Sequence, residues 1–169
     1  MNYLIPESIE SDRLILRTFQ EADWKDLFPY YSDAEATRYT IGRTLTEGET
    51  WRTMATMIGH WTLRKFGPYA LEDKKSGKVI GVTGLWYPND WPEPEIKWGL
   101  TRNYHRQGYA SEAARRVKAM AKEYLPETSL ISLIHPQNEP SIQLALAVGC
   151  TFEKTYEFRG GEYRIYRHH

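Results

Sequence analysis

Residues 95–113 read EIKWGLTRNYHRQGYASEA, and this stretch decides the fold class of the chain. It opens with a short run of aliphatic and aromatic residues, which is typical of a buried strand. A polar loop follows, and from Gly108 to Tyr124 small and apolar residues recur at helical spacing until Pro126 ends the helix. A strand, a short polar loop and a long amphipathic helix in this order indicate a mixed α/β domain.

The start of this helix also suggests a ligand. The first turn of a helix leaves backbone amides without partners, and the positive end of the helix dipole favours an anion such as phosphate. Gly108 and Ala110 are small enough to let a ligand approach the backbone, and Arg102 and Arg106 add positive charge beside them. From these residues alone two interpretations stay open: a phosphate-binding turn, or an ordinary loop whose small residues permit tight packing.

On the N-terminal side of this stretch, strand-like and helix-like segments alternate. Thr46 and Glu49 form a capping box that begins a helix. Segment 88–94 holds three prolines and is predicted to be a surface loop, because proline cannot extend a strand ladder. The predicted strands are 13–19, 68–73, 78–87 and 95–101, and the predicted helices are 21–31 and 47–65.

On the C-terminal side, the pattern predicts a buried strand at 129–134 and a helix at 139–148 that Gly149 ends. A last pair of strands is expected around Gly160 and Gly161. No repeat, low-complexity tract or flexible linker interrupts the sequence, so we expect residues 1–169 to form a single domain.

Charge and composition narrow the classes of function. Lys plus Arg and Asp plus Glu both number 22, so no overall field favours a nucleic acid or an anionic membrane as partner. No segment approaches the roughly 18 apolar residues that would cross a bilayer, and a cytoplasmic protein is expected. Cys150 is the single cysteine and the five histidines lack ligand spacing, so no metal is expected. His168 and His169 resemble the end of a purification tag and are given no functional role.

Two motifs give the stretch a family resemblance. Residues 107–113 closely resemble the coenzyme A loop of the GNAT N-acetyltransferases, whose pattern is Gln or Arg, two residues, Gly, one residue, and Gly or Ala. Gly108 and Ala110 match this pattern, whereas His105 stands where it has Gln or Arg. Residues 138–152 resemble the family's Asn-x-x-Ser helix that ends in Gly-x-x-Phe. The opening residues 11–17, Glu95 with Ile96, and the closing hairpin are similar to the branch that acetylates N-terminal alanine or serine of ribosomal proteins.

The resemblance implies an α/β (α+β) GNAT fold, with a mixed, mostly antiparallel sheet of about seven strands and about four helices. It also implies direct transfer of an acetyl group from acetyl-CoA to a primary amine, on a protein N-terminus or a small molecule, in a ternary complex. Acetyl-CoA and the amine acceptor are the implied partners, and a homodimer is left open. The cofactor-binding residues that it implies are Trp98, Leu100, His105, Arg106, Gln107, Gly108, Tyr109, Ala110, Ser111 and Asn138.

Such a transfer needs a neutral amine. An α-amino group, with a pKa of about 7.7–8.0, is partly neutral at physiological pH, whereas a lysine near about 10.4 needs a stronger base. A general base is therefore expected, directly or through water. Glu95 is the first candidate because it matches the glutamate that begins the family's fourth strand; the other interpretation is a strand-edge charge or a partner for a nearby arginine. Glu93 is a weaker substitute in the proline-rich loop, where we expect it to be solvated.

The departing thiolate needs a proton or a hydrogen bond. Many GNAT enzymes offer a tyrosine on the second motif's helix, where this chain has Ala145. Ser141 is the nearest hydroxyl and could donate to sulfur, or it is an ordinary first-turn residue of a helix capped by Asn138. The missing tyrosine and His105 keep a second function open, a non-catalytic module that senses acyl-CoA.

Several aromatic residues also allow two interpretations. Large aromatic side chains at these spacings either line an acceptor cleft or belong to the core. Cys150 is expected to be a small buried residue rather than a nucleophile. The aromatic candidates are Trp51, Trp61, Trp86, Tyr87 and Trp91.

Overall fold

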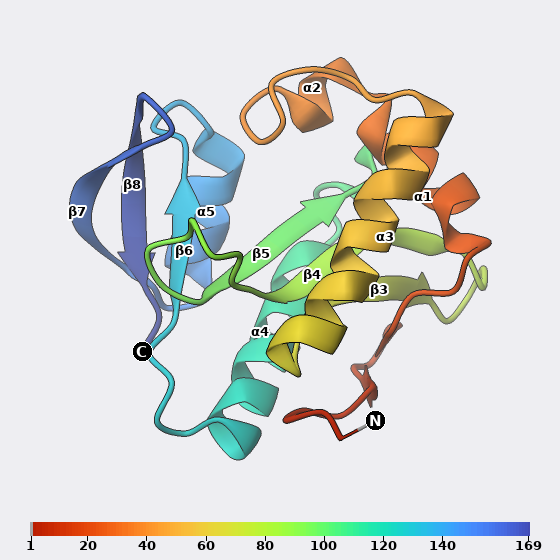
Figure 1. Cartoon of the computed structure of the whole chain (residues 1–169), viewed down its shortest axis with the longest axis horizontal. Helices are drawn as coiled ribbons and strands as arrows, with labels where there is room; N and C mark the ends of the chain where they lie inside the picture. The colour runs from red at the N-terminus through yellow and green to blue at the C-terminus, as the bar shows by residue number, and fades with distance from the viewer. Residues whose placement is uncertain (1) are drawn as a thin grey trace.

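The structure, a computed structural model, describes residues 2–169. Eight strands form one sheet in the order β1-β2-β3-β4-β5-β6-β8-β7 (Figure 1). Neighbouring strands are antiparallel except β5 and β6, which run parallel. The strands are β1 (Ser8–Glu10), β2 (Leu14–Arg17), β3 (Pro68–Asp73), β4 (Val79–Trp86), β5 (Glu95–Leu100), β6 (Ile131–Ile134), β7 (Thr151–Phe158) and β8 (Gly161–Arg167).

Helices cover both faces of the sheet: Figure 1 shows α3 in front of it and α4 behind. On α4, Ala113, Val117 and Met120 are fully buried against the apolar residues of β2 to β5, as the helical spacing predicted. On the other face, Leu27 of α1 and Met54 of α3 enclose a second core. The helices are α1 (Asp23–Tyr31), α2 (Ala34–Thr37), α3 (Glu47–Arg64), α4 (Tyr109–Tyr124) and α5 (Glu139–Ala147), with a 3-10 turn, η1, at Arg102–Tyr104.

The expected fold class is confirmed, and the capping box of Thr46 and Glu49 begins α3 as predicted. Two short elements bring the count to eight strands and five α-helices within residues 2–169, where about seven and about four were expected. These are β1, three residues paired with β2, and α2, four residues capped by the side chain of Asp33. Elements so short carry no hydrophobic period, so the sequence pattern could not predict them.

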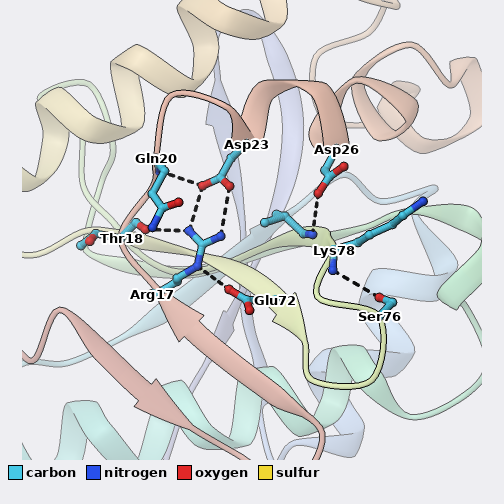
Figure 2. A network of polar contacts seen from close by, with 9 residues as sticks. Arg17, Thr18, Gln20, Asp23, Asp26, Glu72, Ser76 and Lys78 are labelled. Carbon is cyan, nitrogen blue, oxygen red and sulfur yellow. Dashed lines mark hydrogen bonds and ion pairs between the residues drawn. The ribbon is translucent and has the colours of Figure 1, made fainter.

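A partly buried ion-pair network fixes α1 to the sheet (Figure 2). The Arg17 guanidinium on β2 donates to both carboxylate oxygens of Asp23, at 2.9 and 3.1 Å, and to Glu72 on β3 at 2.6 Å. Asp23 is only 6% exposed and also accepts the Gln20 amide at 2.7 Å. These bonds hold α1, the helix that carries Tyr30, against the sheet.

The parallel pair β5 and β6 separates almost at once. A single residue pair, Glu95 with Ile131, is in register, and beyond it the two strands point away from each other (Figure 1). Side chains replace the missing ladder: Ser132 Oγ donates to Ile96 O at 2.8 Å, and the Glu95 carboxylate accepts the Leu133 amide at 2.9 Å. Backbone groups of alternate residues face the same strand edge, so Trp98 presents its N–H and C=O to the opening without a β6 partner.

Candidate active site

Two cavities adjoin at the opening between β5 and β6. The Glu95 cavity, of about 380 Å³, contains Glu95, and the loop cavity, of about 420 Å³, is bordered by the loop that precedes α4. The site therefore has two compartments that meet between the two strands. The residues that line both cavities are Tyr30, Thr40, Trp98, Gly99, Asn138 and Ser141.

The loop cavity borders free backbone amides at the start of α4. Gly108 has φ +82°, and the first intrahelical bond runs from the Glu112 amide to Gly108 O at 3.0 Å. The amides of residues 109–111 therefore have no acceptor in the described part of the chain. With the positive end of the helix dipole behind them, these amides can bind a phosphate or diphosphate group.

Arg13, just before β2, holds this loop in place. Its guanidinium donates to Gln107 O at 2.8 Å and to the Glu112 carboxylate at 2.8 Å, and it lies 3.9 Å from the centre of the Tyr109 ring. Ser11 Oγ donates to the same carboxylate at 2.6 Å. The sequence showed this segment only as part of a resemblance, so its anchoring role was missed.

The predicted cofactor residues gather here with one exception, because Gln107 does not line the loop cavity. The Gln107 side chain instead donates to Asn103 O at 2.9 Å. The His105 ring makes a bond of 2.7 Å between Nε2 and Leu100 O, which ties the loop back to β5. The expectation that Arg102 adds charge beside the turn is wrong, because its guanidinium is paired with Asp33 at 2.6 Å. The residues that do line the cavity are Trp98, Leu100, His105, Arg106, Gly108, Tyr109, Ala110, Ser111 and Asn138.

The start of α5 reaches both cavities. The prediction that Asn138 caps this helix with its side chain is wrong. A capping side chain accepts from the second or third helical amide, and Pro140 at the second position has none. Ser141 Oγ accepts a bond of 3.3 Å from the Trp98 indole, which leaves its own proton free to donate.

Glu95 lines its cavity and is buried, with 6% of its surface exposed. One carboxylate oxygen accepts from the Trp91 indole and the other from the Leu133 amide, both at 2.9 Å. Burial raises the pKa of Glu95 to about 7, although these two donors and the nearby Lys97 charge act in the opposite direction. A carboxyl group that is about half ionised at neutral pH can take up or release a proton there.

The predictions for the partners of Glu95 and Glu93 and for the aromatic cleft residues have mixed outcomes. Glu95 has no arginine partner within residues 2–169. The Glu93 side chain, which we expected to be solvated, is 33% exposed, and Arg167 donates two bonds to its carboxylate at 2.8 and 2.9 Å. Trp86 and Trp91 line the Glu95 cavity, whereas Trp61 is a core residue. The cleft interpretation is also wrong for Trp51 and Tyr87, which do not line the cavity; Trp51 is 42% exposed on α3.

Two further lining residues were not among the candidates from the sequence. Tyr30 is the one tyrosine of residues 2–169 that lines both cavities, and a Cβ on Gly99 would come within 2.5 Å of its hydroxyl oxygen. Only glycine leaves room for Tyr30 over β5 at this point. Lys97 projects from β5 into the Glu95 cavity. No local motif predicts the place of Tyr30, because it depends on packing across the sheet. For Lys97 the available signal is strand alternation, which puts it on the same face as Glu95.

His168 has a structural position that the sequence did not suggest. Its buried ring lies 2.9 Å from Ser132 Oγ and 3.2 Å from Cys150 Sγ, behind the opening of the sheet. Burial lowers the pKa of His168 to about 3 and raises that of Cys150 to about 11. The neutral His168 ring therefore connects Cys150 with Ser132, the serine that donates to β5. Cys150 is a small buried core residue, as expected.

Two features are absent from residues 2–169. No helix there has the length and apolar character needed to cross a membrane. No group of three or more His, Cys, Asp or Glu side chains in the same residues is placed to hold a metal ion.

Comparisons with known proteins agree on one family. A family model described as "Acetyltransferase (GNAT) domain" matches residues 13–151. The uncharacterized N-acetyltransferase p20 of Bacillus licheniformis is 29% identical over 140 residues, which cover 82% of this chain and 79% of that protein. The crystal structure of an acetyltransferase from Agrobacterium tumefaciens superposes with a TM-score of 0.86 at 27% identity, covering 98% of this chain and 95% of that one. RimL, a ribosomal L7/L12 acetyltransferase in complex with coenzyme A, shares the fold with a TM-score of 0.75 at 16% identity, covering 97% of this chain and 96% of its own.

Proposed function

The chain belongs to the GNAT acetyltransferase family, and on this premise we propose that it transfers the acetyl group of acetyl-CoA to a primary amine. The observation that carries the proposal is the junction of the two cavities at the opening between β5 and β6. One compartment offers free amides for a diphosphate, and the other holds a carboxyl group whose pKa is about 7. A thioester at the junction would therefore meet an amine that arrives beside Glu95.

For the cofactor, we assign the diphosphate of acetyl-CoA to the amides of residues 109–111 at the start of α4. The small residues Gly108 and Ala110 leave these amides accessible, and Arg13 keeps the loop in position. The free C=O of Trp98 at the exposed backbone edge would accept a hydrogen bond from an amide group of pantetheine, as it would from a neighbouring strand. Asn138 lines both cavities, and we assign its side chain a further hydrogen bond to pantetheine.

For the reaction, we assign three roles to side chains and backbone of this chain. Glu95 accepts the proton that the amine must lose before its nitrogen attacks the thioester carbon. The Trp98 amide stabilises the charge that develops on the carbonyl oxygen. As the C–N bond forms and the C–S bond breaks, a hydroxyl donates a proton to the sulfur and takes back the second proton that the nitrogen loses. Ser141 is the sequence candidate, and the structure adds Tyr30 as a second hydroxyl at the junction.

The proposed activity is tested by incubating the protein with acetyl-CoA and a panel of primary amines and N-terminal peptides. Thiol release is followed in solution, and mass spectrometry detects the acetylated acceptor. We expect thiol release that depends on an acceptor, with one acetyl group transferred for each thiol formed. Tight binding of acetyl-CoA with no turnover on any acceptor would instead support the sensor module.

The role of the loop before α4 in binding coenzyme A is tested by a substitution at Gly108. Gly108→Val places a β-branched residue at a left-handed backbone position, with its Cβ 3.3 Å from the Arg13 guanidinium. We expect the amides to shift and the Kd for coenzyme A, measured by isothermal titration calorimetry, to rise about tenfold, which is about 1.4 kcal/mol.

Gly77→Val is the matched control, because Gly77 has φ +73° in the β3–β4 turn, with open space around it. Both variants should lose similar stability to backbone strain, but only Gly108→Val should weaken binding. Equal Kd values for the two variants would contradict the assignment of the diphosphate to this loop.

A further inference from the structure

Lys97 places a positive charge in the Glu95 cavity with nothing of opposite sign bound to it. It lies two residues after Glu95 on β5, so the two side chains project from the same face of the sheet. The Lys97 ammonium lies 4.4 Å from the centre of the Trp86 ring. Among residues 2–169 it has no ion pair and no hydrogen-bond acceptor.

Each of the other charged groups of the cavity already has a hydrogen-bond partner. Arg159 is paired with Asp90 at 2.7 Å, and Glu95 accepts hydrogen bonds from Trp91 and Leu133 on its two oxygens. Lys97 is therefore the one unpaired cation among the described residues that line this cavity. Its ammonium is free to bind an anionic group that enters with a ligand.

The surroundings of Lys97 make such a partner favourable. The walls are aromatic, from Trp86, Trp91, Phe158 and Tyr163, and a charged group among apolar side chains is stabilised by an ion pair. Burial lowers the pKa of Lys97, although the Glu95 charge opposes this shift. A carboxylate beside the ammonium would restore the interactions that Lys97 loses by leaving water.

Resting on the proposed function, we infer that the acceptor is a small amine that also carries a carboxylate, as amino acids do. The carboxylate pairs with Lys97 while the amine faces Glu95. Alternate residues of a strand are about 6.6 Å apart, a distance that the two ends of a short amino acid can span. A polyamine would bring a second cation to Lys97, and the N-terminus of a protein would bring a neutral peptide carbonyl.

The test compares acceptors that differ only in this group. Glycine, 3-aminopropanoate and 4-aminobutanoate are each assayed beside their amides, with 1,4-diaminobutane as a dication, by thiol release with saturating acetyl-CoA. For at least one acid we expect a kcat/KM about tenfold or more above that of its amide. Lys97→Met should bring the ratio close to one, Lys97→Arg should preserve it, and Lys97→Glu should favour the diamine. Lys75→Met is the matched control, because Lys75 is exposed in the β3–β4 turn and should keep the wild-type ratio.

The outcomes separate this inference from the activity itself. Turnover without any preference for the acids, unchanged by Lys97→Met, would overturn the inference and leave the transferase intact. Absence of turnover with every amine would overturn the proposed function, and calorimetry with the same acids and the protein saturated with coenzyme A would then decide the inference. Binding that weakens about tenfold in Lys97→Met supports it, and binding that is absent or equal in both proteins overturns it.

Discussion

Replacing Glu95 with glutamine is expected to lower kcat for acetyl transfer by about 10²- to 10⁴-fold, the usual contribution of a general base. The amide cannot accept the proton that the amine loses, so the neutral nucleophile becomes scarce. The Kd for acetyl-CoA should change little, because Glu95 lies outside the loop cavity. Steady-state thiol release and calorimetry measure the two quantities separately.

The glutamine variant needs a structural control, because the Glu95 carboxylate accepts bonds from both Trp91 and Leu133. Glutamine has one accepting oxygen, so one of these donors loses its partner. Circular dichroism should show the same fold, with some loss of stability. Glu95→Asp keeps a carboxylate on a shorter side chain and should retain more activity than the glutamine variant. Wild-type kcat in Glu95→Gln would remove Glu95 as the base.

The largest loss of stability is expected from Arg17→Met, about 3–5 kcal/mol in the free energy of unfolding. The substitution leaves the Asp23 carboxylate, 6% exposed, without its cation, and it also removes a bond to Glu72. Urea denaturation followed by tryptophan fluorescence measures the change. Because α1 carries Tyr30, the variant should also lose activity as it unfolds.

Arg38→Met provides the comparison for this result. Arg38 lies 3.8 Å from Glu35, and both side chains are exposed, at 60% and 66%. Exposed ion pairs contribute at most about 1 kcal/mol, so this variant should remain close to the wild type. A loss as small for Arg17→Met as for Arg38→Met would show that the network of Figure 2 does not anchor α1.

Local patterns predicted the elements around residues 95–113 well. The apolar spacing after Gly108 and the proline at 126 correspond to α4, which ends at Tyr124, and three prolines correspond to the irregular segment between β4 and β5. What these patterns could not predict was the short register of β5 and β6. The sheet opens after one pair of residues, Glu95 and Ile131. The length of this pairing depends on the contacts that Ser132 and Glu95 make between the two strands.

The same distinction holds for the site. The free amides after Gly108 follow from the start of a helix, which sequence shows directly. The direction of individual side chains does not: His105 turns back to Leu100, and Arg102 is paired with Asp33 on another element. Tyr30 reaches the cavities only because α1 packs against a strand that is distant in sequence.

The pH dependence of kcat/KM for the wild type and Glu95→Gln tests most directly whether an amine loses its proton to Glu95 in this cavity. A base with a pKa of about 7 is ionised above that pH, so the wild-type rate should rise with pH through about 7 and be lost below it. With an acceptor whose amine has a pKa of about 10, the rise in rate caused by Glu95 is well separated in pH from the rise caused by the amine. We expect the rise near pH 7 to disappear in Glu95→Gln; the same rise in both proteins would contradict the account.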